Sequence, residues 1–439
     1  MSLIVDKQTQ DDLNLLGKYT PGSIFSLFNK TKTDGGEQLL QTMFLNPLTS
    51  AAAINARRDI FHYFQEKDFT FQLERADFQS TENYLAIESP KMFIVAVFNS
   101  FLKKGQSVLI RDERYDQLVD GLNATIKVLK YAQELSVLLN DNSNTPFDQD
   151  KERLKEILDD PLLRKLIAQQ TNEEFAPYQL AVYDHLLKQT LKGSLNKLLK
   201  IMYSIDVYAN VGRLGKMMGC CYAEAMEKEE NVLNITGLRH PALRNGVSND
   251  LRFDHDANLL FLTGANMAGK STLMKSLGIA IYLAHMGFPI AANQVIFSVR
   301  DGLYTSINVS DNLQTGYSHF YAEVLRVKSA AEQVASGKCF VVLFDELFKG
   351  TNVKDAYDAT LAVTEAFAKY KASAFIVSTH IIEVGEALKG NLSVQFAYMP
   401  TVMNGNKPTY PYKLTPGITS DRQGMIIIEN EGILELLKN

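Results

Sequence analysis

The chain has 439 residues, of which 46% are hydrophobic and 22% are charged, and its 45 basic and 50 acidic side chains give a formal net charge of -5. This composition is typical of a globular protein with sizeable cores, excludes wholesale disorder, and at this length predicts two or three domains. Because the chain lacks a basic excess, any contact with DNA must come from a local patch of charge.

Three cysteines without a C-x-x-C spacing exclude a disulfide framework and favour a reducing compartment. The first residues lack the basic and apolar regions of a signal peptide. The most apolar stretch, Ser276 to Ala292, is interrupted by His285, Gly287 and Pro289, so we interpret it as a buried helix and its exit. We therefore expect a cytoplasmic protein with no membrane partner.

The first half of the chain has a helical pattern. From about Leu13 to Ala225, apolar residues recur at spacings of three and four. Gly35 and Gly36 open an early helix and Pro47 ends it. We expect residues 1–228 to form an all-helical domain.

Two further features mark the end of this half. A polar cluster from Asn140 to Pro146 predicts a flexible loop. The run from Pro177 to Gly212 has the clearest apolar periodicity in the chain and predicts one long amphipathic helix.

After about Glu229, short strand-like runs alternate with helical segments, which predicts a mostly parallel α/β sheet. We place the boundary in the polar stretch from Glu227 to Asn231 and expect residues 229–439 to form an α/β domain. The strand-like runs are Leu259 to Thr263, Phe340 to Phe344 and Phe375 to Ser378.

A glycine-rich segment directly follows the first of these runs and fits the P-loop (Walker A) pattern G-x-x-x-x-G-K followed by Ser or Thr. Its glycines allow backbone N–H groups to turn toward a phosphate, and the helix that follows points its positive end at that anion. We expect Lys270 to reach the β- and γ-phosphates of ATP and the Ser271 hydroxyl to bind Mg²⁺. The segment reads Gly264-Ala265-Asn266-Met267-Ala268-Gly269-Lys270-Ser271.

Two later runs end in residues that suit the same chemistry. Asp345 and Glu346 follow a buried strand, where Asp345 would orient the Mg²⁺ shell and Glu346 would activate water; the plainer interpretation is a strand ending in solvated acids. His380 follows another strand and would sense the γ-phosphate or the attacking water, although a lone histidine there is more often structural. The predicted catalytic residues are Lys270, Glu346 and His380.

These motifs, in this order and spacing, resemble those of the MutS family. The Asn266-Met267 pair inside the loop looks like the MutS P-loop, and Ser310 to Phe320 is similar to the family's signature loop, which reaches the nucleotide of the opposite subunit. Further matching segments are Arg239-His240-Pro241, Asn249-Asp250-Leu251, Asp345 to Asn352, Ser378-Thr379-His380 and, more weakly, Asn29 to Leu40, Asn46 to Thr49, Ile54 to Arg57 and Ile205-Asp206-Val207.

The resemblance implies a core and lever domain followed by an ABC-type P-loop NTPase domain that uses ATP and Mg²⁺. The implied metal ligands are Ser271 and Asp345. The implied nucleotide contacts are Gly264, Ala265, Asn266, Met267, Ala268, Gly269, Lys270, Ser271, Thr272 and, from the opposite subunit, Ser318.

Departures from the family pattern narrow this expectation. Mismatch-reading members carry further domains before the core, one with a Phe-x-Glu motif, whereas few residues precede the core match here. Phe64-Gln65-Glu66 fits that motif but lies inside a predicted core helix, so we interpret Phe64 as structural. Ala265 stands where the family's P-loop has Pro, yet the catalytic set is intact. We expect a short member with core, lever and ATPase domains only.

Two hypotheses follow. The first is a MutS-like homodimeric ATPase clamp with weak, sequence-independent binding to double-stranded DNA and with other repair proteins as partners. The alternative is an ATP-switched protein-interaction module without direct DNA binding. A transporter ATPase subunit is a third interpretation, disfavoured because no Leu-Ser-Gly-Gly-Gln-like signature precedes Asp345.

Overall fold

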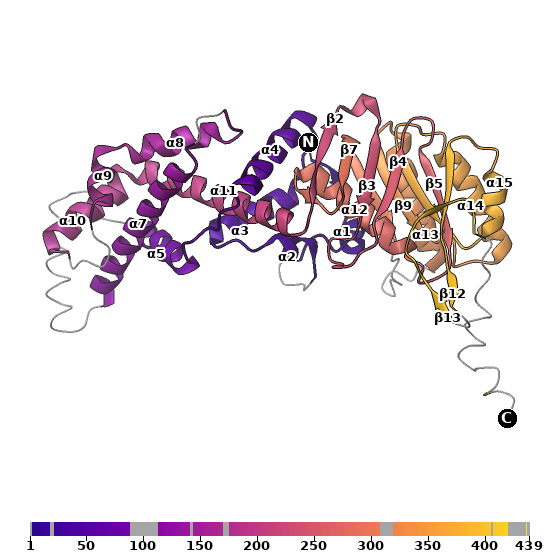
Figure 1. Ribbon diagram of the computed structural model, residues 1–439, viewed down its shortest axis with the longest axis horizontal. Helices are drawn as coiled ribbons and strands as arrows, with labels where there is room; N and C mark the ends of the chain where they lie inside the picture. Colours follow the sequence, from indigo (N-terminus) through magenta and orange to yellow (C-terminus); the bar gives the residue numbers. More distant parts are fainter. Residues whose placement is uncertain are drawn as a thin grey trace. The chain divides into compact units, whose positions relative to one another are not determined.

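The computed structural model describes residues 2–17, 22–87, 113–140, 144–169, 175–307, 319–404, 407–419 and 436. The chain divides into two compact units, and Figure 1 labels many of their helices and strands. Unit 1 contains residues 1–28, 44–58 and 214–439, and unit 2 contains residues 29–43 and 59–213. The N-terminal residues therefore cluster with the C-terminal part of the chain.

Unit 2 is helical, as the spacing of its apolar residues predicts. Helices α3, α4 and α11 contain residues of both units. The helices with residues in this unit are α3 (Asp34–Leu45), α4 (Ala51–Lys67), α5 (Arg75–Ala86), α7 (Glu113–Leu138), α8 (Asp148–Leu158), α9 (Pro161–Ile167), α10 (Pro177–His185), the π-helical turn η1 (Leu186–Thr190) and α11 (Lys192–Met217).

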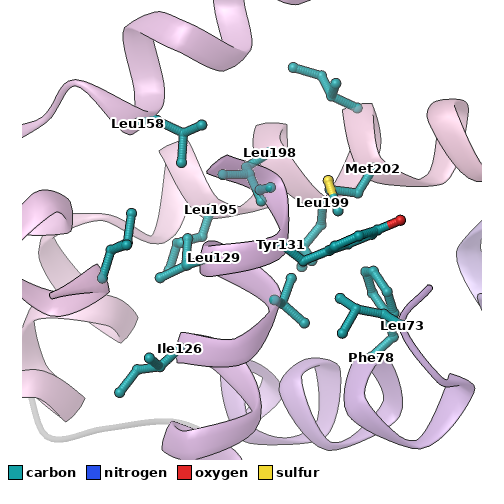
Figure 2. Packing of buried hydrophobic residues seen from close by; sticks show 14 of the residues in the cluster. Leu73, Phe78, Ile126, Leu129, Tyr131, Leu158, Leu195, Leu198, Leu199 and Met202 are labelled. Carbon is teal, nitrogen blue, oxygen red and sulfur yellow. The ribbon is translucent and has the colours of Figure 1, made fainter. Parts of the chain in front are cut away.

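Apolar side chains from all of these helices except α3 form a buried cluster, part of which is shown in Figure 2. Leu195 and Leu198 of α11 are each at most 2% exposed, and Leu129 of α7 belongs to the same cluster. Phe64 is 1% exposed within α4, so the interpretation of Phe64 as a structural residue is confirmed.

The prediction of one long helix from Pro177 to Gly212 is wrong in its middle. Helix α10 gives way to the π-turn η1, and Leu191 separates that turn from α11. Leu187, Leu191 and Leu195 are all buried at successive spacings of four, which exceeds the 3.6 residues of an α-helical turn. The wider π-turn absorbs this excess and keeps the apolar stripe facing the core.

The start of α3 is held by a buried carboxylate. Asp206 of α11 is 1% exposed and accepts hydrogen bonds from the backbone N–H and the hydroxyl of Thr33, at 2.9 and 2.8 Å. A Cβ on Gly36 would lie 2.7 Å from Asp206 Oδ2, so this turn requires a glycine. The predicted helix that opens at Gly35-Gly36 and ends before Pro47 is confirmed as α3.

Unit 1 is built on a seven-stranded sheet of order β1-β8-β9-β10-β5-β11-β14, in which every neighbouring pair is parallel except β11 and β14. The predicted parallel sheet and its three predicted strands are confirmed. The strands are β1 (Ile4–Val5), β5 (Leu259–Gly264), β8 (Gly302–Ser306), β9 (Phe340–Asp345), β10 (Ala374–Ser378), β11 (Val394–Met399) and β14 (Thr415–Pro416).

Helices and two smaller sheets complete this unit. Aromatic side chains of α14, β9 and β10 form part of its core, with the Phe367 and Phe375 ring centroids 5.1 Å apart. The helical elements are α1 (Lys7–Asp12), α2 (Ile24–Phe28), η2 (Lys228–Glu230), α12 (Lys270–Met286), α13 (His319–Ala335), α14 (Val353–Phe367) and α15 (Ile382–Leu388). The remaining strands are β2 (Cys221–Met226), β3 (Leu233–Leu238), β4 (Asn249–Phe253), β6 (Pro289–Ile290), β7 (Gln294–Ser298), β12 (Val402–Asn404) and β13 (Lys407–Thr409).

Strand β2 corrects the expectation that the helical pattern continues to Ala225. Buried Ala223 and Ala225 alternate with exposed Glu224, which is the period of a strand. Alanine and glutamate favour helices in isolation, so pairing with β7 overrides their local preference. Within the described residues, no helix combines the length and apolarity needed to cross a membrane.

The predicted buried helix and its exit are confirmed as the end of α12 and the turn at Gly287. His285 is completely buried, and its Nδ1 lies 2.7 Å from the carbonyl oxygen of Leu48. Since a carbonyl only accepts, Nδ1 carries the proton, and Nε2 accepts from the Arg300 N–H at 3.3 Å. The ring is therefore neutral, and burial lowers the pKa of His285 to about 4.

This histidine predicts a pH dependence of stability. An unfolded histidine titrates near ~6.5, so between that pH and the folded pKa of about 4 the unfolded chain binds a proton that the folded chain does not. Acidification across this window should lower the free energy of unfolding by roughly 3 kcal/mol through His285 alone. Urea unfolding at several pH values gives the free energy of unfolding of wild type and of His285→Gln. The free energy of wild type should fall more steeply as the pH is lowered, and equal slopes for the two proteins would contradict the prediction.

Candidate active site

Three neighbouring parallel strands place the predicted residues at one edge of the larger sheet. Ser378 of β10 pairs in register with Leu262 of β5 and with Asp345 of β9. Because the carboxyl ends of parallel strands meet at one edge, the segments that follow β5, β9 and β10 lie side by side. The structure thereby brings together Lys270, Ser271, Asp345, Glu346 and His380.

The loop between β5 and α12 has a backbone shape that depends on glycine. Gly264 has φ 136° and Gly269 has φ 101°, both outside the region that other residues adopt easily. A Cβ on Gly264 would also lie 2.7 Å from the carbonyl oxygen of Met399 in β11. Helix α12 begins directly after the loop, so its unpaired N–H groups and positive end are available to an anion there.

Replacing this first glycine should destabilise unit 1. Gly264→Ala adds a Cβ where the backbone φ and the Met399 carbonyl both oppose it, with an expected loss of about 2 kcal/mol or more in the free energy of unfolding. Gly390→Ala is the matched control, because a Cβ there meets nothing within 4 Å. Denaturant unfolding of both variants checks this, and equal stability of the two would contradict it.

Lys270 is folded into the loop. Its Nζ donates to the carbonyl oxygens of Gly264 at 2.7 Å and Ala265 at 3.2 Å, and the residue is 4% exposed. Burial lowers the pKa of the ammonium, and the nearby carboxylates of Asp345 and Glu346 oppose that change. A phosphate would be a stronger acceptor for this buried cation than the two carbonyl oxygens.

Asp345 is held by two hydroxyl groups. Its Oδ2 accepts a hydrogen bond from Ser271 Oγ, and its Oδ1 accepts one from Ser378 Oγ at 2.8 Å. Ser271 and Asp345 thus present adjacent oxygens, the ligand type that Mg²⁺ prefers. Among the described residues no group of three or more His, Cys, Asp or Glu side chains could hold a metal, and Mg²⁺ bound with phosphates needs only one or two protein ligands.

Glu346 and His380 form a direct pair. His380 Nε2 donates to Glu346 Oε1 at 2.6 Å, and this hydrogen bond lowers the pKa of Glu346. The Glu346 backbone has φ 57° and its N–H bonds to the Ser378 carbonyl, so the carboxylate leaves the strand through a sharp turn. An ionised carboxylate held in this way is an acceptor for a proton from water.

The loop borders a cavity of about 680 Å³. Arg239, Asn249 and Glu346 also line it. The volume lies within the range of small-molecule sites. The predicted contacts Ala265, Asn266, Met267, Gly269, Lys270, Ser271 and Thr272 line this cavity, whereas Gly264 and the buried Ala268 do not.

Three residues at the site were missed by sequence reasoning or given no such role. Tyr412 lines the cavity and packs on Gly269, where a Cβ would lie 3.0 Å from the ring. Asn249 fixes this segment, since its Nδ2 donates to the Tyr412 carbonyl at 3.0 Å. No local sequence pattern marks Tyr412. The third residue is Ser378, and its hydrogen bond to Asp345 becomes apparent only when the strand register is known.

Ser318 and most of the predicted signature loop lie outside the described residues.

The fold and site define an α/β protein with a glycine-rich loop, a buried lysine and two acids at the carboxyl edge of a parallel sheet. Comparison with known families extends this. MutS domain III matches residues 8–336, and MutS domain V matches residues 260–436. The chain therefore belongs to the MutS family.

Individual relatives agree with the family match. The chain is 31% identical over 234 residues to the DNA mismatch repair protein MutS of Fusobacterium nucleatum, which covers 51% of this chain and 25% of the relative. It is 23% identical over 470 residues to the MutS protein of Leuconostoc mesenteroides, which covers 86% of this chain and 55% of the relative. The chain thus spans at most about half the length of these relatives.

Proposed function

We propose that this MutS-family chain binds and hydrolyses ATP with Mg²⁺ at the cavity beside the glycine-rich loop. One observation supports this proposal most directly. At the ends of three adjacent strands lie the buried cation of Lys270, the hydroxyl–carboxylate pair of Ser271 and Asp345, and the carboxylate–histidine pair of Glu346 and His380. In this proposal residues 229–439 are the ATPase domain, of the ABC-type P-loop class, and residues 1–228 are the core and lever domain.

Each residue of the site has a role in the proposed reaction. Lys270 would exchange its bonds to the loop carbonyls for bonds to the β- and γ-phosphate oxygens. Ser271 and Asp345 would hold Mg²⁺, which when bound neutralises phosphate charge. Glu346 would accept a proton from the attacking water, and His380, through its bond to Oε1, would keep the carboxylate ionised and oriented.

The proposal includes a homodimer in which ATP lies between the glycine-rich loop of one subunit and Ser318 of the other. We infer this contact between subunits from the resemblance of residues 310–320 to the family's signature loop. It suits the exposure of Met267, which lines the cavity and is 79% accessible. Exposed apolar side chains become buried when a second surface covers them.

The matched relatives carry the name DNA mismatch repair protein. We therefore propose double-stranded DNA as a partner, bound weakly and without sequence preference, and other repair proteins as further partners. The alternative, an ATP-switched module that binds only protein partners, is not favoured, because the family match extends over residues 8–336 as well as the C-terminal segment.

Glu346→Gln tests the catalytic proposal. The amide keeps the shape of the side chain but cannot accept a proton from water, so the hydrolysis rate should fall by about 100-fold or more. Binding of a fluorescent ATP analogue should stay close to wild type. Steady-state phosphate release and equilibrium fluorescence measure the two quantities, and an unchanged rate would assign the proton transfer to another group.

A second test concerns the DNA partner. Anisotropy of a labelled duplex should rise on addition of Glu346→Gln protein with ATP, and the logarithm of the association constant should fall linearly with the logarithm of salt, with a slope of about -0.9 per phosphate contact. Scrambling the duplex sequence should change the affinity little. Absence of binding at low salt, with or without ATP, would contradict DNA as a direct partner.

A further inference from the structure

Helix α11 ends in a turn that is closed by two backbone hydrogen bonds. Gly219 follows the helix with φ 58°, the left-handed conformation in which helices commonly end. The N–H of Gly219 donates to the Lys216 carbonyl at 3.1 Å, and the N–H of Cys220 donates to the Gly215 carbonyl at 2.9 Å. This pair of bonds is the Schellman motif, which uses the carbonyl groups of the last helical turn but not those of Met218 and Gly219.

Arg239 binds these two remaining carbonyl groups. Its Nη2 donates to the Met218 oxygen at 3.0 Å and to the Gly219 oxygen at 2.6 Å. The positive guanidinium also suits the negative end of the helix dipole. The backbone of Arg239 is fixed in turn, since its N–H donates to the Ala291 carbonyl at 2.9 Å directly after β3. The side chain of Arg239 is therefore a cap on the C-terminus of α11.

The same arginine lines the cavity of the proposed nucleotide site. An arginine carries five N–H donors on three nitrogens, and only Nη2 is used at the end of α11. Within the described part of the chain, no group accepts a hydrogen bond from Nη1 or Nε of Arg239. Met218, Gly219 and Arg239 all belong to unit 1. One guanidinium thus joins the cavity to the end of a helix and keeps donors in reserve.

A second arginine provides a natural comparison. Arg244 lines the same cavity and is exposed. Unlike Arg239, it makes no hydrogen bond to the end of α11 among the described residues. The two arginines therefore bring the same charge to the cavity, and only one of them is connected to the helix.

We infer that Arg239 is a bridging residue, which binds the nucleotide through Nη1 or Nε while Nη2 caps α11. Guanidinium groups bind phosphate and other acceptors with several donors at once. A bound nucleotide restricts the side chain, so the two bonds to the helix carbonyls break less often. Nucleotide binding therefore stabilises the last turn of α11, and by linkage a closed turn raises the affinity for nucleotide. This inference rests on the proposed function, which supplies the nucleotide.

Hydrogen exchange at the amides of Met218, Gly219 and Cys220 reports the opening of this turn. It is measured by mass spectrometry on the full-length protein, with Mg²⁺ and with or without a saturating non-hydrolysable ATP analogue. The turn at Gly337, which has φ 83° and does not line the cavity, is the internal reference. In wild type the analogue should slow exchange at the end of α11 by about 10-fold, the scale of a hydrogen bond to a charged group, and change exchange at Gly337 by less than about 2-fold.

Two matched variants separate the bridge from the charge alone. Arg239→Met keeps much of the side-chain length without any donor, so exchange at the end of α11 should be faster without the analogue and should not respond to it. Arg244→Met removes the other arginine of the cavity and should keep the wild-type response at saturating analogue. If Arg239→Met does not fold or does not bind the analogue, Arg239→Lys replaces it. Its single nitrogen cannot lie both at the helix carbonyls and at the ligand, so the response should be lost there too.

The outcomes distinguish this inference from the function on which it rests. A wild type that binds no nucleotide contradicts the proposed function and this inference with it. A wild type that binds the analogue without slower exchange at the end of α11 contradicts this inference alone, because Arg239 is then only a structural cap. Equal slowing at Gly337, a response that persists when Arg239 is replaced, or an equal loss of response in Arg244→Met also contradicts the bridge.

Discussion

The pairing of β10 with β5 on one side and β9 on the other is the interaction on which the candidate site depends. Ser378 lies in register with Leu262 and Asp345, so three segments far apart in the sequence leave the sheet side by side. A slip of β9 by one residue against β10 would turn the side chains of β9 to the opposite face and separate Asp345 from both of its hydroxyl partners. The register of the sheet therefore determines which side chains of the candidate site can contact one another.

Charge compensation adds a second constraint at the same edge. The buried ammonium of Lys270 lies near the carboxylates of Asp345 and Glu346, and it uses loop carbonyls as acceptors. A buried cation without such partners would be costly, so loop, lysine and acids are stable only as a set. An anionic ligand would complete this set, which explains why one cavity edge combines a glycine-rich backbone with groups of both charges.

Much of this arrangement could be predicted because it is local. Strands β5, β9 and β10 are short apolar runs that end in polar residues, and the loop at Gly264 has a strict residue pattern. What could not be predicted depends on distant contacts. The π-turn at Leu186–Thr190 relieves a mismatch visible only in the packed core. Strand β2 is alanine-rich and pairs with β7, and Tyr412 reaches the loop from a segment without any motif.

In the proposed function, the glycine-rich loop and Lys270 bind a nucleotide with magnesium. Isothermal titration calorimetry of ATP with Mg²⁺ into wild type and Lys270→Ala tests it most directly. We predict one nucleotide per chain for wild type and a loss of affinity of about 100-fold or more when the buried cation is removed. Absence of binding to wild type, or equal affinities of the two proteins, would contradict the account.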